Sequence, residues 1–375
     1  MVTQDGTKPG RPVSSRRSYL SLAAASVAGF AGIAGSARAA GGDMIVDLGE
    51  KGLATGDVLD PFLEEYLTNG VTVHIPAGTY RWEGEGFHEA ADTNAAVVGQ
   101  GDVTLELIGD AFRNTIRAES GTVEIRNVTV RGKPSEKSHF RLETGPEATI
   151  VVDGLDFPDG AEDETKCRPF YVPRDHAGTV DIRNCYFKGF SDNGIYASSP
   201  GYEDAAGGRV IVENCVSHNN NIAGIRVGSD NSVVRNCLII NDGPSPESRR
   251  NQRNMRGIRV RNPGENIRIE NCEIRMTYDE ASSGIELHEG AAGGSGTIEN
   301  VTIRNDSSSE AIEEEDDVAS GWEASGIEIT GSGDLSYPET FESVCVGPDC
   351  VDPLADKETR IRQVLSADVD PQLRL

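Results

Sequence analysis

Several common features are scarce in this sequence of 375 residues. Aromatic residues make up 6% of the chain, and only seven of its 35 basic residues are lysine. Beyond residue 40, no apolar run approaches the ~20 residues that a membrane-spanning helix needs. Between residues 210 and 303 no segment has the period of an amphipathic helix. Together these absences exclude a spanning helix after residue 40 and a helical fold for the middle of the chain.

Acidic residues are in excess, with 61 Asp and Glu against 35 Lys and Arg, a net charge of −26. Residues 1–39 hold five basic residues and one acidic residue, so without them the net charge becomes −30. Such a field repels nucleic acids and anionic membranes, and we expect neither as a partner. The acidic excess with few lysines resembles the composition of secreted proteins of salt-loving archaea. An ordinary acidic extracellular protein is the alternative.

The first 39 residues have the pattern of an export signal. Twin arginines, Arg16 and Arg17, precede a small apolar stretch over residues 20–35 and an Ala-Arg-Ala cleavage phrase ending at Ala39. This pattern predicts a Tat-type signal over residues 1–39, secretion of the folded chain, and no membrane contact after cleavage. The alternative is an N-terminal membrane anchor, for which the apolar run is short.

Two short phrases alternate along the middle of the chain. Asn-Cys begins at residues 184, 214, 236 and 271, and Gly-Ile begins at residues 194, 224, 257, 284 and 326. The tightest interval, Asn214 to Asn236, is 22 residues. Each unit holds three short strands with a corner at the Asn, so the units must stack to share one core. The pattern predicts an all-β fold, a parallel β-helix.

This repeat, over roughly residues 122–346, resembles the right-handed parallel β-helix, or pectin-lyase-like, superfamily. The resemblance implies a right-handed coil in a secreted protein that acts on or binds a polysaccharide. The superfamily includes polysaccharide lyases, glycoside hydrolases, uronate epimerases and proteins with no known chemistry. A fold shared so widely does not name a reaction.

The repeat and its flanks predict the domain organisation. We expect one β-helix domain over residues 44–346, including an N-terminal cap over residues 44–109, and a tail or loose cap over residues 347–375. Residues 57–69 have helical spacing and stop at Gly70, which predicts a helix across the open end. We expect insertions at residues 158–173, 197–208, 241–255 and 305–325. The last contains an acidic run at 313–317 that is expected to be a solvated loop.

The cysteines give a separate prediction. Four of them, at 185, 215, 237 and 272, occupy the same point of successive units, where Val301 stands in the next. A position that accepts Cys and Val is a small apolar core position. Neighbouring strands ~4.8 Å apart would stack these thiols in a column, unlike the converging ligands of a metal site. We therefore expect no metal and no cofactor, and nothing in the sequence indicates Ca²⁺. Cys345 and Cys350 can close a small loop, which leaves Cys167 unpaired.

The Gly-Ile strands are the expected place of a functional site. Their Ile and Val residues face inward, so the intervening residues face outward on one strip. The predicted substrate-binding residues are Tyr196, Arg226, Arg259 and Arg261, and the predicted catalytic residues are Glu286, His288 and Glu328. Four more arginines, at 249, 250, 253 and 256, lie in the insertion beside the strip.

A basic strip in an acidic chain suits an acidic polysaccharide, because Arg can bind a uronate carboxylate bidentately. A lyase would need a base, for which His288 or an Arg of depressed pKa would serve. A hydrolase would need two carboxylates. Glu286 and Glu328, placed by the repeat on successive coils, could approach the ~5–5.5 Å of a retaining pair.

Other interpretations stay open at this point. The strip can be a ladder of cross-strand ion pairs, a binding site without chemistry, or part of a cell-surface or matrix scaffold. The characteristic phrases of epimerases, polygalacturonases and pectate lyases are absent, and residues 286–289 are only loosely similar to the epimerase phrase. No catalytic residue can be assigned by motif. A groove over residues 226–288 would favour an enzyme, and an open strip a scaffold. We expect a monomer.

The charge generates a first prediction. With a net charge near −30, the protein without its signal should lose stability as salt is removed, because self-repulsion is then unscreened. Thermal unfolding measured from molar to millimolar salt should show a falling melting temperature. An unchanged melting temperature would rule out the halophilic interpretation.

Overall fold

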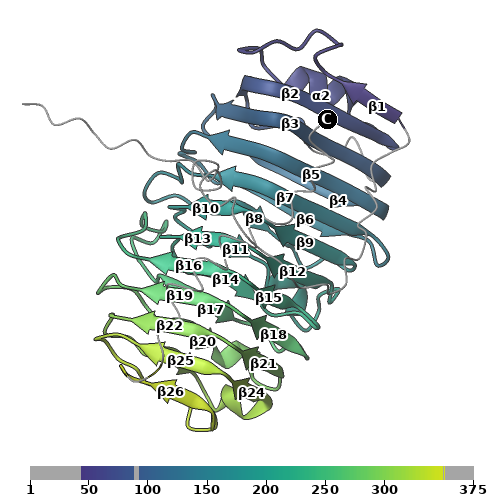
Figure 1. Cartoon of the computed structure of the whole chain (residues 1–375). Helices are drawn as coiled ribbons and strands as arrows, with labels where there is room; N and C mark the ends of the chain where they lie inside the picture. Colours follow the sequence, from purple (N-terminus) through teal and green to yellow (C-terminus); the bar gives the residue numbers. More distant parts are fainter. Residues whose placement is uncertain (1–43, 88–92, 349, 351–375) are drawn as a thin grey trace, which may run out of the picture.

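The computed structural model describes residues 44–87, 93–348 and 350, and the export signal predicted over residues 1–39 lies outside them, as does most of the predicted tail over 347–375. The described chain is a right-handed parallel β-helix, which confirms the predicted fold class (Figure 1). Among the described residues, no helix is long and apolar enough to cross a membrane.

Each strand of the described residues pairs in parallel with its equivalent in a neighbouring coil, within one of two sheets. The 18-stranded sheet contains β1(Met44–Asp47), β2(Val71–Trp82), β3(Thr93–Leu107), β5(Ser120–Arg131), β7(Thr149–Phe157), β9(Thr179–Arg183), β10(Tyr186–Lys188), β12(Arg209–Glu213), β13(Val216–His218), β15(Val233–Arg235), β16(Leu238–Asn241), β18(Ile267–Glu270), β19(Glu273–Met276), β21(Gly296–Glu299), β22(Thr302–Asn305), β24(Trp322–Ser325), β25(Ile327–Thr330) and β26(Val344–Val346). The eight-stranded sheet, here called the site sheet, contains β4(Arg113–Ala118), β6(His139–Thr144), β8(Phe170–Tyr171), β11(Ile195–Tyr196), β14(Ala223–Val227), β17(Arg256–Val260), β20(Ile285–Leu287) and β23(Ile312–Glu314).

The predicted three-strand coil is confirmed. In one coil, β12 leads through a corner at Asn214 into β13, and β14 follows in the site sheet. These three strands pair with β15, β16 and β17 of the next coil. In the first coils the corner is continuous, and the long strands β2, β3, β5 and β7 run through it.

The asparagine corners have a backbone cause. The Asn residues at 127, 184, 214, 236, 271 and 300 all have φ between 52° and 56°, in the left-handed region that Asn and Gly tolerate best. Gly154 and Gly326 take the same corner with φ of 71° and 64°. The Gly-Ile phrase at residue 326 was therefore assigned wrongly. Thr302 pairs with Glu328, so Ile327 takes the core position that Val301 takes in the preceding coil. Gly326 is therefore a corner residue.

The cysteine column lies in the core, as predicted. Cys185, Cys215 and Cys237 are fully buried, Cys272 is 1% exposed, and Val301 and Ile327 continue the column. Burial raises the pKa values of the first three thiols, so these cysteines are neutral apolar packing groups. All five cysteines outside the disulfide are buried.

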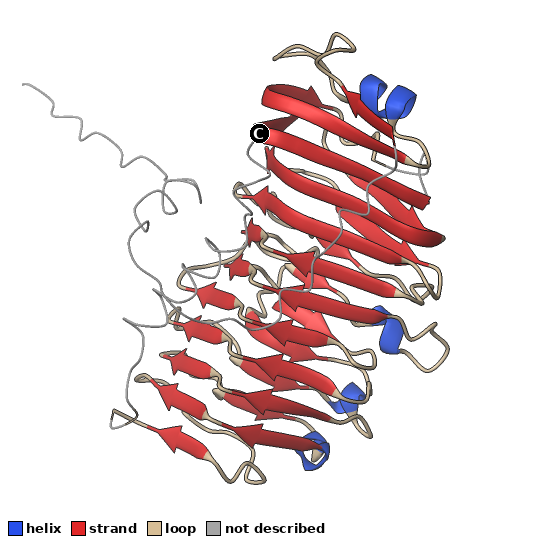
Figure 2. Cartoon of the chain, turned by 45° about the vertical axis from the view of Figure 1, so that its right-hand side comes forward, coloured by secondary structure: helices blue, strands red, loops and turns tan. Residues whose placement is uncertain are grey.

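The N-terminal cap and the last insertion differ in part from the expectation. The capping helix is shorter than predicted, α2(Asp60–Tyr66), and lies beside β1 and β2 at the N-terminal end (Figure 2). The insertion expected over residues 305–325 contains β23, the short helix η3(Val318–Gly321) and β24. Glu313 and Glu314 thus belong to a strand of the site sheet and not to a solvated loop. Two further short helices, η1(Ser199–Gly201) and η2(Glu289–Ala291), follow β11 and β20.

The core column predicts how Cys215 tolerates substitution. Cys215→Ser should lower the free energy of unfolding by about 1–3 kcal/mol, because it buries a hydroxyl among apolar neighbours. Cys215→Val should cost less, because the same column already holds a buried valine, Val301, three positions further on. Chemical denaturation checks both. Equal losses in the two variants would mean that the thiol is needed for more than packing.

Candidate active site

The outward residues of the site sheet form a ladder whose order is set by strand register. From β8 to β23 the aligned residues are Tyr171, Tyr196, Arg226, Arg259, Glu286 and Glu313. The structure therefore brings four predicted site residues, Tyr196 to Glu286, onto adjacent strands. Like charges at neighbouring positions repel each other, so the pair of arginines at 226 and 259 needs compensation from its surroundings.

A groove of about 630 Å³ lies over the middle of this ladder. Its lining includes Tyr196, Arg226 and Arg259, with Arg256 at the start of β17. Arg261, Glu286 and His288 are not among the lining residues. A groove is thus present over the strip, but it is centred on the predicted binding residues and displaced from the predicted catalytic ones.

Two insertions form the wall of this groove. The segment before β8 and the segment before β17 meet side by side, with Thr165 bridged in parallel to Ser248. The Glu164 N–H donates to the Glu247 carbonyl oxygen at 3.0 Å, and the Arg249 N–H donates to the Thr165 carbonyl oxygen at 3.0 Å. The two insertions come from coils that are three strands apart in the site sheet, so their pairing crosses β11 and β14.

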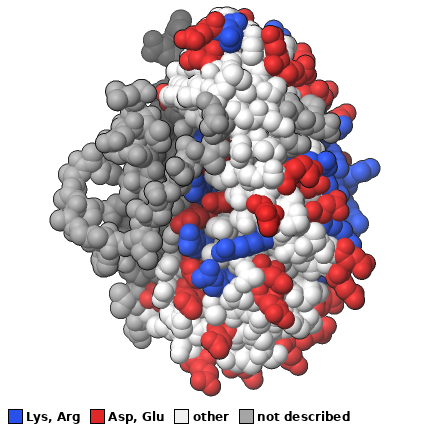
Figure 3. All heavy atoms as spheres, turned by 90° about the vertical axis from the view of Figure 1, so that its right-hand side faces the viewer, with Lys and Arg blue, Asp and Glu red and all other residues white. Residues whose placement is uncertain are grey.

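The groove is strongly basic. Six cationic side chains line it: Lys166, Arg226, Arg249, Arg250, Arg256 and Arg259. Among its described lining residues the one carboxylate is Asp192, which forms an ion pair with Arg168. On the face drawn in Figure 3, acidic side chains are spread widely, and Lys and Arg lie in fewer places, chiefly in the middle and at one edge.

Arg226 is the most unusual of these cations. The residue is 8% exposed and forms no ion pair among the described residues. Its Nε donates to the Ser198 hydroxyl at 2.8 Å, and its guanidinium carbon lies 4.2 Å from the centre of the Tyr196 ring. Burial lowers the pKa of Arg226, but an arginine stays protonated at neutral pH. A buried cation without a carboxylate is costly, and a bound anion would relieve that cost.

Glu286 has a different environment. It is fully buried, and its two carboxylate oxygens face Arg256, at 2.7 Å, and Arg259. Burial raises the pKa of Glu286, against the lowering effect of the two arginines. This carboxylate lies between two cations and outside the groove lining, so its role is to hold the two arginine side chains in place. The interpretation of the strip as a ladder of ion pairs is correct for these three residues.

His288 is buried beside the end of β20. Its Nδ1 accepts the Gly290 N–H at 2.9 Å, and its Nε2 lies 3.6 Å from a Glu315 oxygen. Burial, with Arg259 and Arg261 nearby, lowers the pKa of His288 to about 4. The ring is therefore neutral at pH 7 with its proton on Nε2, and Nδ1 is already occupied. This geometry gives no support to His288 as a general base.

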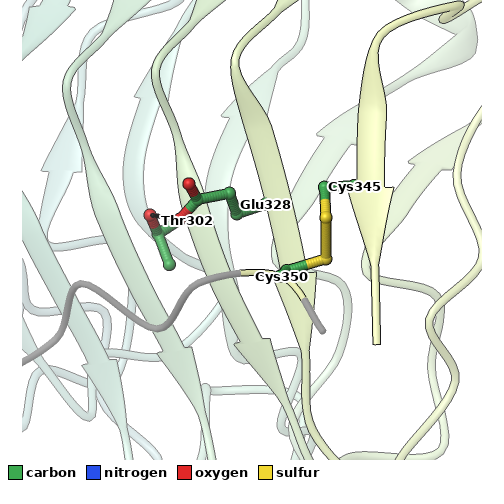
Figure 4. The surroundings of a disulfide bond; sticks show 4 residues. All are labelled: Thr302, Glu328, Cys345 and Cys350. Carbon is green, nitrogen blue, oxygen red and sulfur yellow. Dashed lines mark hydrogen bonds between the residues drawn. A yellow bond between two sulfur atoms is a disulfide. The ribbon is translucent and has the colours of Figure 1, made fainter. Parts of the chain in front are cut away.

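Glu328 is not on the site sheet. It lies on β25 of the other sheet, where Thr302 donates to its carboxylate at 3.3 Å (Figure 4). The residue that follows Glu286 on the next coil is Glu313. The predicted juxtaposition of Glu286 and Glu328 is wrong, because Gly326 is a corner residue and not the start of a site-sheet strand. The Cys345–Cys350 disulfide drawn beside it confirms the expected small loop.

Two groups of side chains could approach a metal ion. They are His288 with Glu289 and Glu315, and Glu286 with Glu313 and Glu315. The second group includes the carboxylate already neutralised by Arg256 and Arg259, and the first lies close to Arg259 and Arg261. Cations so near compete directly with a bound metal ion.

Some groove residues escaped the sequence analysis. Lys166 and Asp192 lie in segments between repeats, where no period marks them. The four arginines of the second insertion were placed beside the strip only because arginine is frequent in that segment. Of these, Arg249, Arg250 and Arg256 line the groove, whereas Arg253 pairs with Glu247 at 3.1 Å.

Comparison with family models agrees with the fold. Residues 174–348 match the family model described as right handed beta helix region. One similar solved structure is a polysaccharide lyase of the PL6 family from Pseudopedobacter saltans, with 12% identity, 82% of this chain and 92% of that chain covered, and a TM-score of 0.36. Another is the A-module of a mannuronan C-5 epimerase from Azotobacter vinelandii, with 15% identity, coverage of 73% and 89%, and a TM-score of 0.35. Likenesses this distant do not bear on what this chain does. A search of curated proteins found no match.

The ion pairs change what is expected of Arg259. Its outward position on the strip predicts a surface charge, but the side chain is 12% exposed and neutralises a fully buried carboxylate. Arg259→Ala should therefore lower the free energy of unfolding by about 1–3 kcal/mol, less than the full loss of a buried pair because Arg256 stays. The double variant Arg259→Ala with Glu286→Gln should recover part of the loss. Chemical denaturation of both variants tests this, and an unchanged stability in Arg259→Ala would contradict it.

Proposed function

We propose that this protein is a secreted β-helix protein that binds and acts on an acidic polysaccharide in the groove over β11, β14 and β17. Export by the signal predicted over residues 1–39 would deliver it, as a monomer, to the compartment where such polymers occur. The anionic class of the ligand follows from the charge of the groove lining, and the extended shape of the ligand follows from the fold.

The lining charge supports an anionic ligand. Six cations face one carboxylate in the groove, in a chain whose net charge is −26. Nucleic acid is also anionic, but the field of the whole molecule repels a long polyanion of high charge density. A uronate polymer carries its carboxylates singly along a neutral sugar backbone, and each matches the fork of one guanidinium.

Arg226 carries the proposal. Arg256 and Arg259 already have Glu286, and Arg168 already has Asp192. Arg226 lines the groove, is almost fully buried, and has only a hydroxyl and an aromatic ring as described partners. A ligand carboxylate is the group that would complete its coordination. A scaffold with no ligand would have no reason to keep such a cation buried at an open groove.

The groove also favours one reaction class over another. A glycoside hydrolase places two carboxylates on either side of the scissile bond. The described lining offers only Asp192, which is already engaged by Arg168. Lyase-type chemistry needs instead a cation at the uronate carboxylate and a group that removes the adjacent proton. The groove supplies the cation in Arg226.

The test is Arg226→Gln, with Arg304→Gln as a matched control. Arg304 lies on β22 of the other sheet, is half exposed and pairs with Asp306 at 3.0 Å. Arg226→Gln should weaken binding of a uronate polymer such as polygalacturonate or alginate about 10- to 100-fold, the value of one or two charge-assisted hydrogen bonds. Isothermal titration calorimetry measures the affinity.

Folding provides the internal check. Arg226→Gln should keep or raise the melting temperature, because it removes a buried charge that has no carboxylate partner. Arg304→Gln should leave both affinity and melting temperature nearly unchanged. If wild-type protein binds no uronate polymer at any salt concentration, or binds it equally well after Arg226→Gln, the proposed function is wrong.

A further inference from the structure

Tyr196 lines the groove next to Arg226, the residue proposed to bind the ligand carboxylate. It lies on β11, directly between Tyr171 of β8 and Arg226 of β14 in the strand register. It lines the groove, whereas Tyr171 does not. A carboxylate bound by Arg226 would therefore lie beside the phenol of Tyr196.

Two guanidinium groups face the Tyr196 ring. The Arg226 and Arg168 guanidinium carbons lie 4.2 Å and 5.1 Å from the ring centre. Arg168 is fixed by its ion pair with Asp192, and the Tyr171 ring packs at 5.3 Å between centroids. The ring is thus held rigidly in a positive environment, which favours an anion at the phenol oxygen.

The charged and polar groups around Tyr196 act in opposite directions on its ionisation. Burial raises the pKa of Tyr196, but Arg226, hydrogen bonding with the Ser199 and Tyr202 side chains, and Arg168 together lower it below its usual value. The groups that act on it or pack against it are Arg168, Tyr171, Ser199, Tyr202 and Arg226, and Asp192 pairs with Arg168. A phenol that ionises more readily than usual is better suited to accept a proton near neutral pH.

We propose that Tyr196 is the proton-transfer residue of a β-elimination on the uronate whose carboxylate Arg226 binds. This inference rests on the proposed function, and it assigns the reaction to a lyase. It replaces His288 and Glu286, whose environments make them structural.

The step balances without a further reactant. The Tyr196 phenolate takes the proton on C5, next to the carboxylate, while Arg226 neutralises the negative charge that develops there. The electron pair released forms the C4–C5 double bond, and the bond from C4 to the glycosidic oxygen breaks. That oxygen takes the proton from the Tyr196 hydroxyl, which restores the phenolate. The products are a new chain end and an unsaturated uronate.

The experiment compares Tyr196→Phe with Tyr171→Phe in the full chain. Both remove one hydroxyl from adjacent rings of the same ladder, but only Tyr196 lines the groove. Turnover is read as ultraviolet absorbance of unsaturated uronate ends on a panel of polygalacturonate, alginate and other uronate polymers. Tyr196→Phe should lower turnover 10²–10⁴-fold, the range for a lost proton-transfer group, with affinity changed about twofold at most. Tyr171→Phe should leave both within about twofold.

Ionisation of the phenol gives an independent readout. Activity of the wild type should rise with pH through the pKa of Tyr196, because the phenolate is the base. A difference titration of wild type against Tyr196→Phe, followed by phenolate absorbance, should show one phenol ionising below its usual range. Replacement of Tyr196 by a fluorinated tyrosine, which ionises more readily, should shift the rise of activity with pH to lower pH.

The outcomes separate this inference from the proposed function. If the wild type binds a uronate polymer but releases no unsaturated ends, or if Tyr196→Phe keeps its turnover, the role of Tyr196 is wrong and polysaccharide binding stands. If no polymer binds, both fail. The assignment is supported if Tyr196→Phe alone loses turnover while it still binds the polymer. The fluorinated residue should then also shift the pH–activity profile.

Discussion

Parallel pairing between coils governs this molecule. Because each strand lies about 4.8 Å from its equivalent in the next coil, whatever residue type occupies one position is brought against the same position above and below. In the interior this produces continuous columns of Cys, Val and Ile, which pack well. On the site sheet it brings Arg226 against Arg259, and Arg259 against Glu286. The same constraint that makes a continuous core therefore concentrates charge on one strip of the surface.

The chain resolves that concentration of charge in three ways. Glu286, fully buried, neutralises the arginines at 256 and 259, and Asp192 holds Arg168. Among the described residues, Arg226 contacts a hydroxyl and the face of Tyr196 in place of a carboxylate. The carboxylates that seemed suited to acid–base chemistry thus hold other cations in place, and Arg226 is the buried cation that can accept a ligand.

Local rules account for what the sequence predicted well. Asn in the left-handed region marks a corner, alternating apolar residues mark a strand, and both recur at each coil, so the fold and most of the ladder could be deduced. The errors have the same origin. Glycine tolerates the corner conformation as well as asparagine does, so Gly326 was taken for the start of a site-sheet strand, and Glu328 was placed on the wrong sheet. The true equivalent, Ala311 before Ile312, has no glycine and was overlooked.

The sequence by itself determined the parallel β-helix, its core columns and the outward position of Tyr196, Arg226 and Arg259, because each depends on a short period repeated along the chain. Only the tertiary structure decided which of these residues form a site. The wall of the groove comes from two insertions, joined at Thr165 and Ser248, that share no period and meet across two intervening strands. The pairing of Glu286 and the isolation of Arg226 likewise depend on side-chain packing in three dimensions, which spacing along a sequence does not encode.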